Sequence, residues 1–193
     1  TPNRADCLSV YGIARELINI DKAYKFKKYN KYQKISSTCS NSKIKFNILE
    51  KKLCPRYGYM YLENISTTSK TPTYISERLE NIGIKTINPI VDILNYIMID
   101  IGQPMHAYDA DKLDGEISIR LAKNKEVIKA LDDNEYKLDQ ENIVVSEKNK
   151  IIALAGIIGS KEFSVTSETK NIIIESAFFI PEALSNKARK LKI

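Results

Sequence analysis

Residues 171–179 read NIIIESAFF, and this stretch decides the fold that we expect for the chain. Apolar side chains occupy both alternating sets of positions, which is typical of a strand covered on both faces. The stretch KIIALAGIIG at residues 150–159 has the same almost continuously apolar character. Within it, Ala155, Gly156 and Gly159 lack bulky side chains, which permits the close approach of a backbone or a ligand. The sequence therefore predicts buried strands at the centre of the fold.

Further strands are predicted on the N-terminal side of these two stretches. The sequence RYGYMYLENIS at residues 56–66 alternates and is rich in aromatic residues. After the turn signal Asp114-Gly115, the strand-like stretches EISIRLA and NIVVSE follow at residues 116–122 and 142–147.

Four segments have the apolar spacing and end signals of helices. In the second segment, residues 71–83, Thr71 is expected to cap the helix and Pro72 to take its first position. In the third, we expect Asn88 to cap the helix and Gly102 to close it in the left-handed conformation. In the fourth, a proline opens the helix and apolar residues share one side. The predicted helices cover residues 6–20, 71–83, 88–102 and 181–192.

The composition bounds the classes of protein to which the chain can belong. With 193 residues, 43% hydrophobic and 28% charged, it has enough apolar material for a sizeable core. No apolar run is long enough to span a bilayer, and no signal peptide is evident, so we expect a cytoplasmic protein without a membrane partner. The net charge of +6 favours a polyanionic partner such as RNA. The three cysteines, with one histidine, are too few for a disulfide framework or a structural zinc site.

A lysine-rich segment divides the chain. Six lysines between residues 22 and 34 are interleaved with aromatic residues. The lysines could contact phosphates while the aromatic rings stack on bases. A solvated linker or an edge strand is the alternative that we favour, because serine and asparagine follow at once. We therefore predict a leading helix and connecting segment over residues 1–42 and a main module over residues 43–193.

Two residues are candidates for chemistry because of where they lie. His106, the only histidine, follows a helix end in GQPMHAYD, on a tight connection where a side chain can be aimed. Glu175 interrupts the apolar strand at 171–179 and should share a face with Ile173 and Ala177. A carboxylate there is costly unless it is paired, hydrogen-bonded or used. The alternatives are a histidine satisfied by loop backbone and a glutamate paired with a lysine at the rim.

Common catalytic templates do not fit the sequence. It contains no GxxxxGK[ST] phosphate-binding loop, no GxSxG nucleophile elbow and no HExxH metal motif.

Several stretches taken together resemble a known family, the bacterial phenylalanine–tRNA ligase β subunit. They are TPNRADCLSVYGIARE, INPIVDILNYIMIDIGQPMHAYD, LAGIIGS and NIIIESAFFIPEALSNKARKLKI, which run in one consistent order from Thr1 to Ile193. The resemblance is to the third and fourth domains, which edit mischarged tRNA. It implies an α+β fold with helices packed on a β-sandwich-like core of mixed sheets, made by two intimately joined domains.

The resemblance also implies a function for particular residues. The editing site hydrolyses tyrosyl-tRNA-Phe and spares phenylalanyl-tRNA-Phe, with Glu175 receiving the phenol hydroxyl and the Ala155–Gly156 backbone helping. His106 would orient the ester or the attacking water, and its neighbour Ala107 would belong to the substrate-binding residues. No metal is implied at this site. The whole ligase, with its α subunit, would use ATP and magnesium.

Departures from the family pattern leave two other functions open. Tyr108 replaces a phenylalanine, Ser160 replaces a glycine, and Asp133 stands where the family has the glycine of its LDG turn. The family also has a further pocket segment beyond the position of Ile193, so we expect a fragment with weak activity of its own. A non-catalytic module that contacts tRNA, or a free-standing tRNA deacylase, is the alternative.

Overall fold

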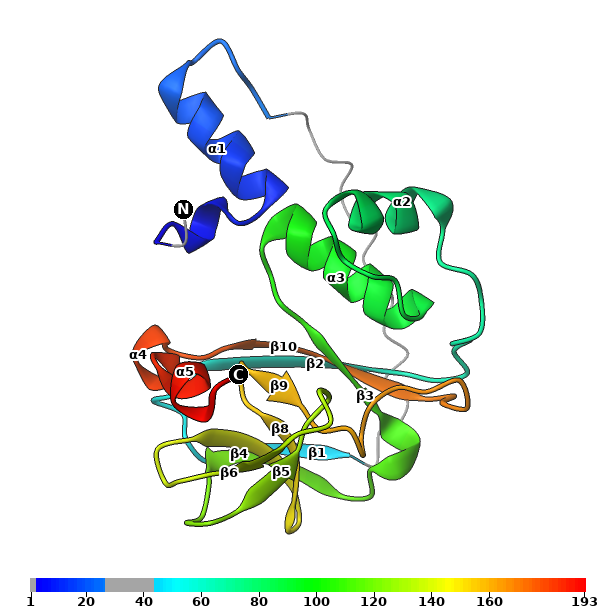
Figure 1. Ribbon diagram of the computed structural model, residues 1–193, viewed down its shortest axis with the longest axis vertical. Coiled ribbons are helices and arrows are strands. Elements are labelled where there is room, and N and C mark those ends of the chain that lie inside the picture. Colours follow the sequence, from blue (N-terminus) through cyan, green and yellow to red (C-terminus); the bar gives the residue numbers. More distant parts are fainter. Residues whose placement is uncertain (1–2, 27–43) are drawn as a thin grey trace. The chain divides into compact units, whose positions relative to one another are not determined.

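The computed structural model describes residues 3–26 and 44–193, and within them the chain forms two compact units. Unit 1 comprises Thr1–Asn41 and Lys70–Met105, and unit 2 comprises Ser42–Ser69 and His106–Ile193. Figure 1 traces both along the sequence. The prediction of a continuous module over residues 43–193 differs from the structure, because residues 70–105 group with the leading helix. Residues 27–34 of the lysine-rich segment lie outside the described residues.

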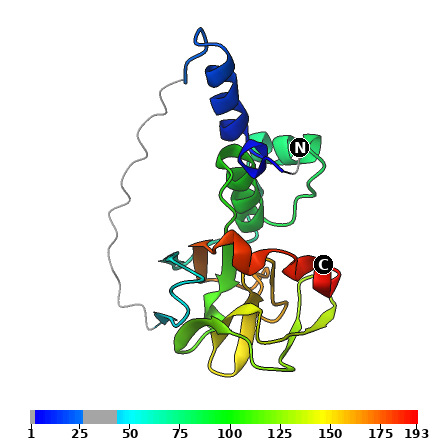
Figure 2. The ribbon, with the colours of Figure 1, turned by 90° about the vertical axis from the view of Figure 1, so that its left-hand side faces the viewer.

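Unit 1 is helical. The end of α3 lies beside the start of α1 (Figure 2), where a Cβ on Gly102 would contact the side chain of Ser9 at 3.1 Å. Asn88 caps α3 as predicted, because its side chain accepts hydrogen bonds from two backbone amides of the first turn. Gly102 closes the helix with φ of 82°, also as predicted. The elements are η1 (Ala5–Cys7), α1 (Val10–Ile20), α2 (Thr73–Asn81) and α3 (Pro89–Ile101).

Unit 2 contains the sheets. A three-stranded antiparallel sheet has the order β2-β10-β3, and a five-stranded sheet has the order β1-β4-β7-β8-β9, in which only the β1–β4 pair is parallel. A two-stranded sheet pairs β5 with β6. The strands are β1 (Lys45–Ile48), β2 (Arg56–Leu62), β3 (His106–Asp109), β4 (Glu116–Leu121), β5 (Val127–Lys129), β6 (Glu135–Lys137), β7 (Ile143–Glu147), β8 (Lys150–Leu154), β9 (Ile158–Gly159) and β10 (Ile172–Phe178). The short helices are η2 (Ala110–Lys112), α4 (Pro181–Leu184) and α5 (Lys187–Leu191).

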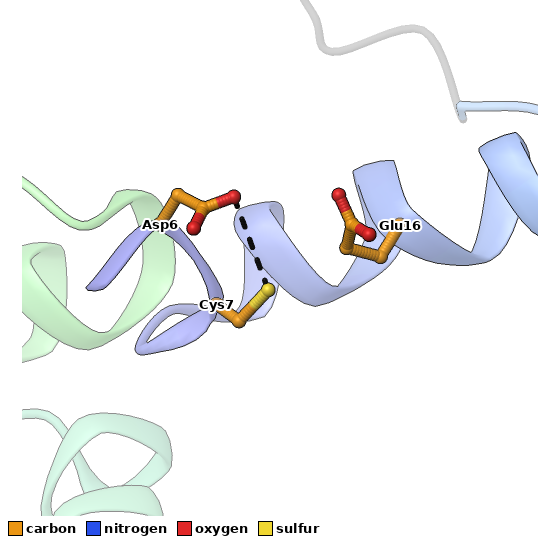
Figure 3. A group of neighbouring side chains, drawn as sticks. All are labelled: Asp6, Cys7 and Glu16. Carbon is orange, nitrogen blue, oxygen red and sulfur yellow. Dashed lines mark hydrogen bonds between the residues drawn. The ribbon is translucent and has the colours of Figure 1, made fainter. Parts of the chain in front are cut away.

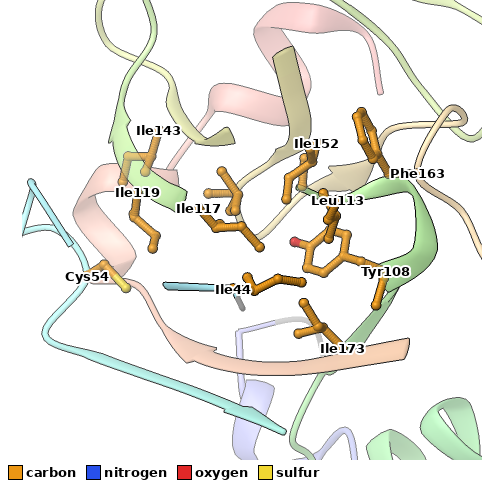
Figure 4. Packing of buried hydrophobic residues seen from close by; sticks show 14 of the residues in the cluster. Ile44, Cys54, Tyr108, Leu113, Ile117, Ile119, Ile143, Ile152, Phe163 and Ile173 are labelled. Carbon is orange, nitrogen blue, oxygen red and sulfur yellow. The ribbon is translucent and has the colours of Figure 1, made fainter. Parts of the chain in front are cut away.

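The main core of unit 2 lies between the three-stranded and five-stranded sheets. Tyr108 and Ile173 from the smaller sheet pack with Ile117 and Ile152 from the larger one (Figure 4). Leu184 of α4 packs against this cluster. A second cluster joins β5 and β6 to β7 and β8. The predicted α+β fold with a β-sandwich-like core is therefore confirmed.

Four local predictions differ from the structure. The stretch 150–159 is not one strand, because a turn at Ala155–Ile157 separates β8 from β9. The last segment forms two short helices, since Asn186 adopts a positive φ of 61° between them. Thr71 does not cap α2, because its hydroxyl bonds the carboxylate of Asp92. His106 lies at the start of β3 rather than on the tight connection predicted after the helix.

Two further properties concern the whole described part of the chain. Cys7 and Cys54 are free thiols, and Cys39 lies outside the described residues. None of the helices there is long and apolar enough to cross a bilayer.

Candidate functional site

The register of the three-stranded sheet brings several polar side chains together on its inner face. Glu175 of β10 lies opposite Tyr59 on one side and opposite His106 on the other. The next inward pairs along β10 are Ala177 with Tyr57 and Ile173 with Tyr108. Residues directly opposite in a sheet share a face, and the face alternates along each strand. The prediction that Glu175 shares a face with Ile173 and Ala177 is therefore confirmed.

The Glu175 carboxylate is held by two phenol hydroxyls. Tyr57 donates to Oε2 at 2.8 Å, and Tyr108 donates to the same oxygen. We call Tyr57, Tyr108 and Glu175 the tyrosine–glutamate cluster. The Glu175 side chain is buried, with 7% of the residue exposed, and it makes no ion pair with any described lysine or arginine. The alternative of a lysine partner at the rim is therefore not what the structure shows.

Burial dominates the electrostatics of the tyrosine–glutamate cluster. It raises the pKa of Glu175 above its usual range, while the hydrogen bonds from Tyr108 and Tyr57 act in the opposite direction. Burial, and next the charge of Glu175, raise the pKa of both tyrosines far above their usual value. The phenols therefore stay protonated and remain donors to the carboxylate.

Cys54 lies close enough to this cluster to be affected by it. Burial, followed by the charge of Glu175, raises the pKa of its thiol to about 11. A thiol in this state is a poor nucleophile, because the thiolate is the reactive form. The structure therefore gives no support to a cysteine–histidine pair in unit 2.

His106 brings an uncharged imidazole to the edge of the cluster. Its ring meets the ring of Tyr108 edge-on, with centroids 4.6 Å apart. Burial lowers the pKa of His106 to about 4, so the imidazole is neutral at pH 7. Its Nε2 is buried and has no hydrogen-bond partner among the described residues. A buried polar atom without a partner is costly, so a hydrogen-bonding ligand or water at Nε2 would remove a penalty of about 1–3 kcal/mol.

Gly159 is the glycine that lies against this imidazole. A Cβ on Gly159 would be 2.5 Å from Cε1 and 2.6 Å from Nε2 of His106, so the position leaves no room for a side chain. The carbonyl of Gly159 accepts a hydrogen bond from the Leu131 amide, which fixes β9 at this point. The sequence singled out Gly159 as a small residue in a buried strand, but nothing local linked it to His106.

The structure places the predicted Ala155–Gly156 pair in the turn before β9. The amide of Ala155 donates to the carbonyl of Ile143, so it is not available to a ligand. The Gly156 amide has no acceptor among the described residues, and φ of 68° suits a glycine there. A Cβ on Gly156 would lie 2.7 Å from a methyl group of Leu184. Any part for this pair in substrate binding therefore rests on the Gly156 amide.

Ala107 lies between His106 and Tyr108 on β3 and points to the other face of the sheet. It is buried there, so its side chain does not reach the tyrosine–glutamate cluster. The structure thus brings Glu175 and His106 onto one face and adds Tyr57, which the sequence analysis missed. The signal for Tyr57 lay in the alternation of RYGYMYL, but its partner was 118 positions away.

Ser160 lines a hollow that contains no residue of the tyrosine–glutamate cluster. The hollow has a volume of about 550 Å³ and is also lined by Lys129, Lys150 and Lys161. Two of these lysines already pair with the carboxylates of Glu162 and Asp133. We assign no chemistry to this hollow, because it holds neither of the two candidate residues.

Among the described residues of unit 1, one group of side chains could serve as metal ligands. Asp6, Cys7 and Glu16 offer ligand atoms within 4.8 Å of one another (Figure 3). Arg4 bonds both carboxylates, and Arg15 adds a second partner to Asp6. The hydrogen bond from Arg4 is the main reason why the pKa of Asp6 lies below its usual range. This group is therefore an exposed ion-pair network whose negative charge is already balanced.

The comparisons with known proteins agree with this architecture. The family model described as the B3/4 domain matches residues 53–193. The chain belongs to the B3/4 domain family. All members of the tyrosine–glutamate cluster, together with His106 and Gly159, lie inside the matched B3/4 residues.

Relatives of this B3/4 chain are ligase subunits. It is 41% identical to the phenylalanine–tRNA ligase beta subunit of Francisella tularensis over 193 residues, covering 100% of this chain and 24% of that protein. It is 40% identical to the subunit of the same name from Idiomarina loihiensis, covering 98% of this chain and 24% of that protein. The chain therefore spans about a quarter of the length of these relatives.

One solved structure supports the fold. An N-terminal fragment of the phenylalanyl-tRNA synthetase beta-subunit from Pyrococcus horikoshii matches with a TM-score of 0.55 at 18% identity. The match covers 94% of this chain and 54% of that fragment. At this identity the likeness concerns the fold of the B3/4 chain alone.

Proposed function

We propose that this chain is the editing module of a phenylalanine–tRNA ligase β subunit and that it hydrolyses tyrosyl-tRNA-Phe. The observation that carries the proposal is the pairing of the buried Glu175 carboxylate with phenol hydroxyls. A site that selects tyrosine over phenylalanine has to recognise one hydroxyl group in apolar surroundings. A carboxylate in such surroundings does so strongly, because a substrate without the hydroxyl leaves the carboxylate unpaired.

His106 supports the same proposal from β3, on the same face of the sheet as Glu175. Its neutral imidazole offers Nε2 as a hydrogen-bond acceptor, and Glu175 lies opposite on the neighbouring strand. In the proposed reaction, His106 orients a water molecule whose oxygen bonds to the ester carbonyl carbon. The bond from that carbon to the ribose oxygen breaks, and a proton from the water passes to the ribose oxygen. Tyrosine and uncharged tRNA-Phe are the products.

Positioning is sufficient for most of the rate acceleration in this reaction. An aminoacyl ester is already activated, and holding a water molecule in line with the carbonyl removes much of the entropic barrier. Because its pKa is about 4, His106 is a weak base but an effective hydrogen-bond acceptor at pH 7. ATP and magnesium, which the family resemblance implies for the whole ligase, have no assigned residues in this chain. tRNA-Phe and the α subunit are the partners that we propose.

The decisive experiment measures hydrolysis of tyrosyl-tRNA-Phe and phenylalanyl-tRNA-Phe by the ligase that contains this chain. We expect Glu175→Ala to abolish the preference for the tyrosyl ester and His106→Ala to slow hydrolysis of both esters. Selectivity that survives Glu175→Ala would remove the carboxylate from recognition. No hydrolysis of the tyrosyl ester by the unaltered ligase would favour a non-catalytic module that contacts tRNA.

A further inference from the structure

The tyrosine–glutamate cluster contains two tyrosines whose function the proposed editing reaction does not explain. Both hydroxyls converge on Oε2 of Glu175, Tyr57 from β2 and Tyr108 from β3. Tyr108 is completely buried, so its hydroxyl cannot form a hydrogen bond with solvent. Two donors on a single carboxylate oxygen hold that oxygen in a fixed direction.

The second oxygen of the carboxylate is left without a protein partner. Among the described residues, nothing donates a hydrogen bond to Oε1 of Glu175. A carboxylate can accept hydrogen bonds at both oxygens, so Oε1 keeps its full capacity as an acceptor. A third phenol hydroxyl, from a bound tyrosine, would therefore not have to displace Tyr57 or Tyr108.

The ionisation of Glu175 decides whether Oε1 can do this. A protonated carboxylic acid is a weaker acceptor and would lose most of its preference for a phenol over a phenyl ring. Burial favours the protonated form, and the two phenol donors favour the ionised form. The other titratable groups around Glu175 do not supply a positive charge. Tyr59 lies opposite on β2, His106 is neutral, and the Cys54 thiol stays protonated.

We propose that Tyr57 and Tyr108 are positioning residues that hold Glu175 ionised through Oε2 and thereby leave Oε1 as the acceptor for the substrate phenol. This inference rests on the proposed editing function for its substrate, but the ionisation of Glu175 can be measured without any substrate. Tyr108 is the more informative residue to change, because it is completely buried and its hydroxyl donates to Glu175.

The first test measures the ionisation of Glu175 directly by NMR titration of the ¹³C-glutamate-labelled 193-residue chain. Tyr108→Phe and Tyr57→Phe each remove one hydroxyl and keep the ring, and circular dichroism monitors the fold of each variant. Tyr59→Phe is the matched control, because Tyr59 lies on the same face and bonds no atom of Glu175 among the described residues. We expect the pKa of Glu175 to rise in the first two variants and to stay unchanged in the control. An unchanged pKa in both variants would overturn the inference.

The second test follows the ratio of tyrosyl to phenylalanyl ester hydrolysis as a function of pH in the ligase that contains this chain. We expect the pH at which selectivity is lost to move upward in Tyr108→Phe, with about a tenfold lower ratio on the acidic side, the effect of one charged hydrogen bond. Selectivity at alkaline pH should be retained. A higher rate on the tyrosyl ester without any movement of the profile would mean that Tyr108 competes with the substrate, and would refute the positioning role. If the unaltered ligase hydrolyses neither ester, the editing function fails while the NMR result still decides the role of the two tyrosines.

Discussion

Replacing Gly159 with alanine tests whether the position of the His106 imidazole depends on the absence of a side chain at this point of β9. The new Cβ would lie 2.5 Å from Cε1 and 2.6 Å from Nε2 of His106. Atoms that are not bonded normally approach to about 3.5–4.0 Å, so the ring has to move by about 1 Å. Misplacement of a positioning group by this distance costs about 100-fold in rate. We therefore expect hydrolysis of tyrosyl-tRNA-Phe to fall about 100-fold.

The effect of this substitution on stability should be smaller. Overpacking of a well-packed site costs about 1–3 kcal/mol, and we expect a value near the lower end because an imidazole can rotate away. Leu131, the next neighbour, lies 3.2 Å from the new Cβ and has to give way only slightly. Urea unfolding of Gly159→Ala, His106→Ala and the double variant measures this cost. In the double variant the clash is absent, so adding Gly159→Ala to His106→Ala should cost almost nothing. A double variant in which both losses add fully, or a single Gly159→Ala variant with unaltered hydrolysis, would refute the contact.

Three further expectations follow from individual side chains. Burial lowers the pKa of His106 from 6.5 to about 4, so the neutral ring favours the folded state. The neutral ring contributes at most about 3 kcal/mol to the free energy of unfolding, and this contribution is complete above pH 6.5 and is lost as the pH falls towards 4. Urea unfolding of His106→Asn, measured between these two pH values, should lack this pH-dependent contribution. Asn88→Ala should destabilise the chain by about 1 kcal/mol in the same assay, because the cap of α3 loses two acceptor contacts, and an unchanged unfolding midpoint would contradict that role. Cys54 is 1% exposed and its thiol has a pKa of about 11, so it should resist alkylation at pH 8 while Cys7 reacts. Mass spectrometry measures the labelling of each cysteine, and equal labelling of the two would contradict the burial of Cys54.

Local periodicity was sufficient for the features that depend on neighbours in the sequence. The alternation of 171–179 gave the correct face for Glu175, because a strand turns its side chains to opposite faces whatever it pairs with. The Asn88 cap and the Gly102 closure of α3 were also predictable, since each is satisfied within one helical turn. These features rest on backbone geometry that a few residues determine.

Features that depend on distant partners could not be predicted in this way. Tyr57 became part of the site only through the pairing of β2 with β10, and the contact of Gly159 with His106 joins strands of two different sheets. The turn after Leu154 could not be predicted, because an apolar run with small residues is equally compatible with one long strand. The local sequence marked Glu175 and His106 as candidates, but the roles assigned to them came from the family resemblance.

The distance between Tyr57 and Glu175 along the chain has a consequence for synthesis and folding. These residues are 118 positions apart, and β10 is the last of the strands in residues 44–193. Pairings across so long a loop form slowly, because closing the loop costs entropy before any contact rewards it. While a ribosome is still making the polypeptide, β2 and β3 lack the strand that lies between them in the finished sheet. The carboxylate therefore joins the two tyrosines last, and the tyrosine–glutamate cluster cannot assemble in a nascent chain before β10 has emerged.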